Sequence, residues 1–111
     1  MPKGLAGNYL VVLVTCGTRR EAQRIARAAV EQRLAACVNV IESPVRSVYR
    51  WKGKVEQTRE FVLLIKTSRR RLAALQAAIR CLHSSDVPEF IALPIVAGSA
   101  EYLDWLGDCL R

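Results

Sequence analysis

Residues 34–39 read LAACVN and residues 49–54 read YRWKGK, and these two stretches decide the fold. The first ends a helical pattern and begins an extended one, with the thiol of Cys37 at the junction. The second is an aromatic-rich extended segment that leads into Lys52-Gly53, a pair that fits a tight hairpin turn. We therefore expect a compact β-α-β-β unit around these stretches.

The preceding residues supply the first strand and the first helix. Residues 9–15 read YLVVLVT, a continuous apolar run typical of a strand that is buried on both faces. Thr18 and Glu21 form a capping box, in which each side chain can bond the backbone amide of the other residue. The amphipathic helix that follows should run to about Leu34.

A long hairpin is expected after the second strand, which begins at Cys37. Residues 45–51 should pair with a return strand at residues 54–67. The outer half of the return strand is polar, whereas its inner half, FVLLI at residues 61–65, is wholly apolar. The hairpin tip should therefore project from the core, while the inner half and the first strand take the two central positions of the sheet.

The rest of the chain predicts a second helix, a last strand and a terminal helix. Ser68 is a candidate N-cap, and apolar residues recur at helical spacing over residues 72–82. Residues 90–96 form the last strand, in which Pro94 indicates a sheet edge. The order β-α-β-β-α-β with a C-terminal helix predicts the α+β class and a ferredoxin-like sandwich with one antiparallel sheet.

Length and composition limit the domain count and the class of protein. The chain has 111 residues, of which 51% are hydrophobic, so it should form a single domain over residues 1–111. Residues 1–8 should be a flexible lead-in. No apolar run reaches the roughly 18 residues of a membrane span, and no export signal is recognisable, so we expect a cytoplasmic protein without a membrane partner. The four cysteines form no Cys-x-x-Cys motif and should be reduced.

The net charge of +7 invites a nucleic-acid partner, but its distribution argues against one. Most arginines lie on the polar faces of the two predicted amphipathic helices, where solvated charge is ordinary. No aromatic stacking motif accompanies them. We therefore expect no nucleic-acid function.

Several sequence blocks, in the same order along the chain, resemble the CutA family of divalent-cation tolerance proteins. The blocks are RLAACVN (33–39), SVYRWKG (47–53), LIKT (64–67), PE (88–89), LPI (93–95) and YLDWL (102–106). The resemblance implies a ferredoxin-like fold, a tight homotrimer similar to the trimeric PII signalling proteins, clefts between subunits and no established reaction. The residues themselves require only that the exposed edges of the hairpin be covered, which a neighbouring copy can do.

The loop after the second helix departs from the family pattern. The family usually has His-Pro-Tyr-x-x-Pro-Glu here, whereas this chain has HSSDVPE at residues 83–89. Ser84-Ser85 therefore replaces a rigid aromatic contact. If that tyrosine helps to wall the cleft, the ligand preference of this chain should differ.

Three residues are candidate metal ligands. Cys16 ends the first strand, Cys37 matches the family cysteine, and His83 is the only histidine. Thiolate and imidazole suit copper or another soft divalent cation. Each residue also has a structural interpretation, because a free cysteine commonly fills an apolar space and His83 can stabilise the end of the second helix.

Five residues form a candidate ligand cleft. Tyr49 and Trp51 share one face of the hairpin and can line an inter-subunit cleft or pack at an interface. Lys66, near the end of the central strand, can hold an anionic ligand or pair with Glu60 or Glu89.

These observations predict a non-enzymatic, trimeric, cytoplasmic protein of the CutA type that responds to metal ions. It would need no cofactor and would bind copper or another divalent cation. The alternative is a PII-like signalling protein that binds a small anion between subunits, and a third hypothesis is an assembly module that holds a partner. No Ser-His-Asp spacing, Gly-rich phosphate loop or metal-hydrolase motif supports catalysis.

Overall fold

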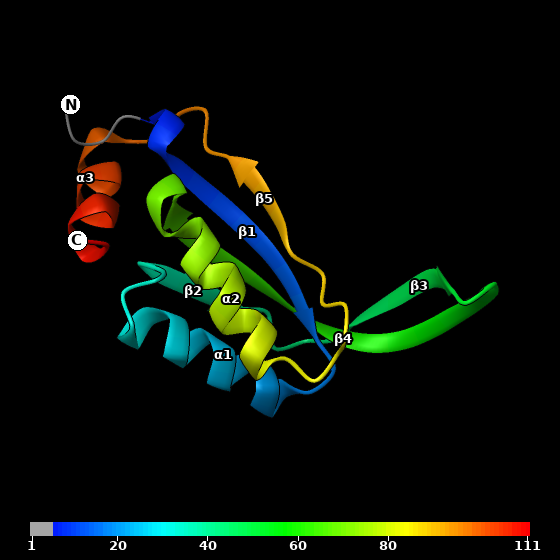
Figure 1. Cartoon of the computed structure of the whole chain (residues 1–111). Helices are drawn as coiled ribbons and strands as arrows, with labels where there is room; N and C mark the ends of the chain where they lie inside the picture. The colour runs from blue at the N-terminus through cyan, green and yellow to red at the C-terminus, as the bar shows by residue number, and fades with distance from the viewer. Residues whose placement is uncertain (1–5) are drawn as a thin grey trace.

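The computed structural model describes residues 6–111 as a five-stranded antiparallel sheet with three α-helices (Figure 1). The strands are β1 (Tyr9–Cys16), β2 (Cys37–Val40), β3 (Val45–Trp51), β4 (Lys54–Ser68) and β5 (Ile91–Pro94). Their order is β2-β4-β1-β5, and β3 pairs with the outer half of β4. β1 and β4 are central, as their apolar content predicts, and the α+β ferredoxin-like arrangement is confirmed.

Helices α1 (Arg19–Glu31) and α2 (Leu72–Leu82) lie together over one face of the sheet, and α3 (Ala100–Cys109) lies at one end (Figure 1). α1 is shorter than predicted because Arg33 adopts a left-handed conformation with φ of 58°. This turn lets two following amides bond the carbonyl of Ala29 and closes the helix.

Short 3-10 helices adjoin the first strand and the second helix. η1 (Ala6–Asn8) forms part of the predicted lead-in, and the remainder of that lead-in, residues 1–5, lies outside the described residues. η2 (Arg69–Arg71) precedes α2, and the Ser68 hydroxyl accepts a hydrogen bond from the amide of Arg71 at 3.3 Å. The predicted cap therefore acts on η2. β5 is also shorter than predicted, with Pro94 on an edge strand.

The main core lies between the helices and one face of β1 and β4. Val12, Val14, Leu63 and Ile65 point to this face and are fully buried against α1 and α2. A second, smaller core packs α3 against the beginning of β1, with Tyr9 among its buried members. The two cores hold the two ends of β1, since Cys16 belongs to the main core and Tyr9 to the smaller one.

The opposite face of the sheet is apolar and has no helix packed across its centre (Figure 1). Val11 and Leu13 of β1 point to it. They pair with Leu93 and Ile91 of β5, which are 45% and 48% exposed. An apolar face of this kind calls for a further covering layer.

The hairpin of β3 and β4 projects from the body of the molecule, whose extents are 48 × 25 × 25 Å (Figure 1). Its turn has positive φ at Lys52 and Gly53, 51° and 80°, as a type I′ turn requires. Val48 and Val55 near the tip are strongly exposed. The predicted projection of the hairpin is therefore confirmed.

Candidate functional site

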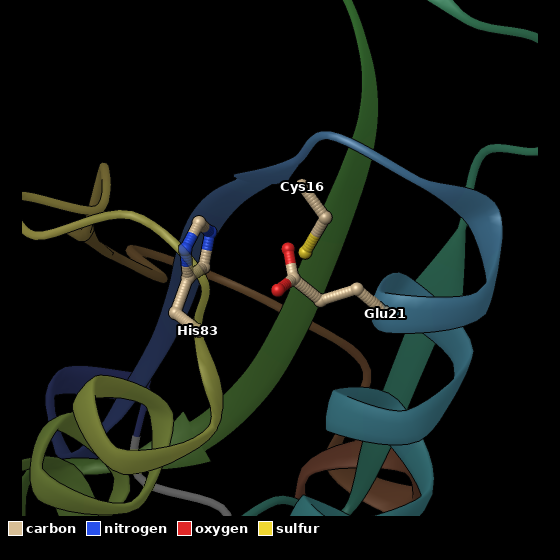
Figure 2. Close-up of side chains that lie close together, drawn as sticks. All are labelled: Cys16, Glu21 and His83. Carbon is tan, nitrogen blue, oxygen red and sulfur yellow. The ribbon is translucent and has the colours of Figure 1, made fainter.

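Three potential metal ligands converge where β1 ends, α1 begins and α2 ends (Figure 2). They are Cys16, the last residue of β1, Glu21 in the first turn of α1, and His83, which follows α2. Their ligand atoms all lie within 4.8 Å of one another. Sulfur, nitrogen and oxygen donors at this spacing suit a soft or borderline cation.

The thiol of Cys16 is completely buried. Burial raises its pKa from 9.0 to about 12, and the nearby carboxylates of Glu21 and Glu60 add to the rise against a smaller opposite effect of Arg24. Cys16 therefore carries its proton near neutral pH.

Glu21 is a buried acid whose carboxylate accepts two hydrogen bonds from Ser84, one from the amide at 2.7 Å and one from the hydroxyl at 3.2 Å. The prediction that Glu21 bonds back to its own helix cap is therefore wrong. Only the other half of the capping box forms, in which the Thr18 hydroxyl accepts from the Glu21 amide at 3.1 Å. A proline has no amide proton to donate, so the proline that the resemblance implies at position 84 could not make the bond of the Ser84 amide.

Both ring nitrogens of His83 are engaged. Nε2 lies 2.7 Å from the carbonyl oxygen of Thr15, and Nδ1 accepts from the amide of Ser85 at 3.0 Å. The carbonyl can only accept, so Nε2 carries the proton and the Nδ1 lone pair faces Ser85. A metal at Nδ1 must therefore displace the Ser85 amide.

A hollow of about 700 Å³ opens beside His83 at the foot of the hairpin. It brings together four of the five predicted cleft residues, Tyr49, Trp51, Glu60 and Glu89. Together with Asp86, its described lining includes three carboxylates but neither lysine nor arginine. The hollow, called here the acidic bay, is therefore suited to cations rather than anions.

Lys66 lies apart from the acidic bay. Its ammonium group donates to the side-chain oxygen of Asn39 and lies 4.0 Å from the sulfur of Cys37. Lys66 and Glu60 are six positions apart on β4, about 20 Å in an extended strand. The predicted pairing of Lys66 with Glu60 or Glu89 is therefore replaced by a contact with Asn39.

Cys37 also lies away from the other candidate metal ligands. It pairs with Lys66 across β2 and β4, whereas Cys16 pairs with Phe61 across β1 and β4. Phe61 and Lys66 are five positions apart on β4, so the two cysteines are separated by about 17 Å along the strand direction. Within one chain, Cys37 does not join Cys16 and His83, and its use across subunits stays a prediction.

A model of the CutA1 divalent ion tolerance protein family matches residues 10–109. The chain belongs to the CutA1 family. The predicted resemblance is thereby confirmed. Among CutA1 relatives, the divalent-cation tolerance protein CutA of Thermus thermophilus is 47% identical over 96 residues, which cover 86% of this chain and 92% of that protein. Human protein CutA is 44% identical over 100 residues, which cover 90% of this chain and 55% of the human protein.

Solved CutA1 structures share the fold. The crystal structure of CutA1 from Oryza sativa matches with a TM-score of 0.91 at 40% identity, covering 96% of this chain and 97% of that chain. The Thermus thermophilus structure matches with a TM-score of 0.86 at 46% identity, covering 88% and 94%. Within residues 6–111, no helix is both long and apolar enough to cross a membrane.

Proposed function

We propose that this CutA1 chain binds a thiophilic divalent cation such as copper through Cys16, Glu21 and His83. The observation that carries the proposal is the convergence of a thiol, a carboxylate and an imidazole within 4.8 Å. Several relatives are named divalent-cation tolerance proteins, which agrees with a cation as the ligand. Binding and release, without a chemical reaction, would account for this role, and we expect no enzymatic activity.

The buried thiol limits which cations can bind. With a pKa of about 12, Cys16 must lose a proton at a cost of about 7 kcal/mol near pH 7. A cation that binds sulfur strongly can offset this cost, since structural zinc sites gain about 10–16 kcal/mol. A hard cation such as Mg²⁺ gains little from a thiolate and should not bind. One proton is released on binding, so affinity should rise by about tenfold per pH unit near neutrality.

The acidic bay supports the same proposal. His83, Ser84 and Glu60 line the bay. Ser84 also bonds Glu21, and the carboxylate of Glu60 raises the pKa of Cys16. On a chain with a net charge of +7, a hollow with three carboxylates locally attracts cations. We propose that cations approach the buried ligands through this bay.

We further propose that the chain functions as a homotrimer in the cytoplasm. The apolar sheet face and the projecting hairpin both need a cover, and neighbouring copies would supply it by closing a ring. Such packing would also bury Lys66 and Cys37, which point to the same face as Val11. Cys37 would then lie at a contact between two subunits. Light scattering on the purified chain should give three times the chain mass, and a stable monomer would contradict this proposal.

A cobalt(II) titration tests the cation site, because cobalt bound to a thiolate gives a charge-transfer absorption band. We expect a saturable band that copper or zinc abolishes by competition and Mg²⁺ leaves unchanged. Cys16→Ser should remove the band, Glu21→Gln and His83→Ala should weaken binding, and Cys81→Ser, an exposed cysteine on α2, is the control. A band that survives Cys16→Ser would refute the site.

A further inference from the structure

A second hollow, of about 500 Å³, lies at the end of β1 opposite to Cys16. Tyr9 and Ser68, which pair across β1 and β4, line it together with Arg69 and Arg70. The last turn of α3 forms another wall. Tyr9 and Cys16 are seven positions apart on β1, which places this hollow about 23 Å from the cation site. It is therefore a separate feature of the molecule, called here the arginine hollow.

Two largely buried residues, Tyr9 and Ser68, carry hydroxyl groups at the arginine hollow. Tyr9 is 7% exposed, and its hydroxyl has no hydrogen-bond partner among residues 6–111. This hydroxyl lies beside Gly107, where a Cβ would come within 2.4 Å of it, and Gly107 also lines the hollow. Ser68 is 9% exposed and accepts from the Arg71 amide, while its own proton has no acceptor in the described part of the chain. The Tyr9 ring is held by burial while its hydroxyl stays within reach of a ligand in the hollow, so the hydroxyl can donate to that ligand.

Two guanidinium groups are held at the rim of the hollow by backbone carbonyls. Nε of Arg69 donates to the carbonyl of Gly7 at 2.6 Å, and Arg70 donates to the carbonyl of Leu110 at 3.3 Å. Each guanidinium has five N–H donors, so most remain available. Within residues 6–111, no carboxylate forms an ion pair with either group. Neither guanidinium is therefore held by a direct ion pair with a described carboxylate.

We propose that the arginine hollow binds a phosphate group. Two guanidinium groups and two hydroxyls offer donors from several directions, which matches a tetrahedral oxyanion better than a planar carboxylate. The volume is within the usual range for small-molecule sites and exceeds the size of a bare phosphate ion. The ligand class is therefore a phosphate monoester, with its phosphate on Arg69 and Arg70.

Calorimetric titration of the full chain with inorganic phosphate and with phenyl phosphate, at ionic strength matched with chloride, tests the site. We expect saturable binding of both, with phenyl phosphate tighter. Arg70→Gln should weaken binding by at least about tenfold, and Tyr9→Phe, which keeps the buried ring, by about threefold to tenfold. Arg20→Gln removes an exposed arginine of α1 outside the hollow and is the matched control. Ser68→Ala serves as a second hydroxyl variant, and Cys16→Ser should bind phosphate normally.

Co-sedimentation with phosphatidylcholine vesicles that contain phosphatidic acid separates a lipid source of the phosphate from a soluble one. Binding to the vesicles alone, lost in Arg70→Gln and Tyr9→Phe, would assign the phosphate to a lipid headgroup. Binding to the soluble phosphates would assign it to a metabolite. No saturable binding in either arm, or binding that falls equally in Arg20→Gln and Arg70→Gln, would overturn the proposal.

Discussion

The buried thiol of Cys16 should make the folded protein sensitive to alkaline pH. Its pKa is 9.0 in a solvated chain and about 12 in the fold, where burial is the main cause. Between these values the unfolded thiol loses its proton while the folded thiol keeps it. The contribution of this group to stability is therefore complete below pH 9 and is lost as the pH rises towards 12.

The size of the effect follows from linkage. At pH 11 the unfolded thiol is about two units above its pKa, so the free energy of unfolding should fall by about 3 kcal/mol relative to pH 8 through this group alone. Urea unfolding at both pH values, at one protein concentration, measures the fall. Other groups titrate in every variant, so the comparison is between wild type and Cys16→Ala.

Wild type should lose about 3 kcal/mol more than Cys16→Ala over this range. Cys81→Ala removes an exposed thiol and should behave as wild type. An equal alkaline loss in wild type and Cys16→Ala would show that Cys16 does not titrate differently in the folded and unfolded states. The reasoning about the buried, protonated thiol would then be refuted.

Two further substitutions test contacts at the two ends of β1. Ser84→Pro should lower the free energy of unfolding by about 1–3 kcal/mol, because Glu21 loses both of its donors while the extended backbone of His83 accepts a following proline. Thermal unfolding measures this loss of stability. If Ser84→Pro is as stable as Ser84→Ala, the predicted contribution of the Ser84 amide is contradicted. Gly107→Ala should cost about 1–3 kcal/mol, because the new Cβ would lie 2.4 Å from the Tyr9 hydroxyl. The Gly107→Ala, Tyr9→Phe double variant should regain part of that loss, and no recovery would show that the hydroxyl is not the obstacle.

The helices and strands could be predicted from the sequence because each has a strong local signal. The run at residues 9–15, the Thr18 cap and the Lys52-Gly53 turn all lie where expected. The ends of elements were less predictable. The left-handed Arg33 that ends α1 has no glycine signature, and the hydrogen bonds of the following amides to Ala29 are visible only in the structure.

The candidate site was harder to predict because it depends on contacts between distant segments. Glu21 was interpreted as a capping residue, since capping is local, whereas its partner Ser84 lies 63 positions away. The available signal was a carboxylate in the first turn of the helix that follows a strand ending in cysteine. Lys66 and Cys37 were grouped with residues of the opposite sheet end because the register of β4 against its neighbours is not visible in the sequence.

The length of β4 restricts where this chain can gain or lose residues. β4 pairs with three of the other four strands, and successive side chains point to opposite faces. One residue inserted between Phe61 and Ser68 would turn Leu63 and Ile65 away from the helices and carry Lys66 into their place. Insertions near Gly53 would alter only the tip of the hairpin. Homologues should therefore vary in length at the turn, while the inner half of the strand keeps a constant count.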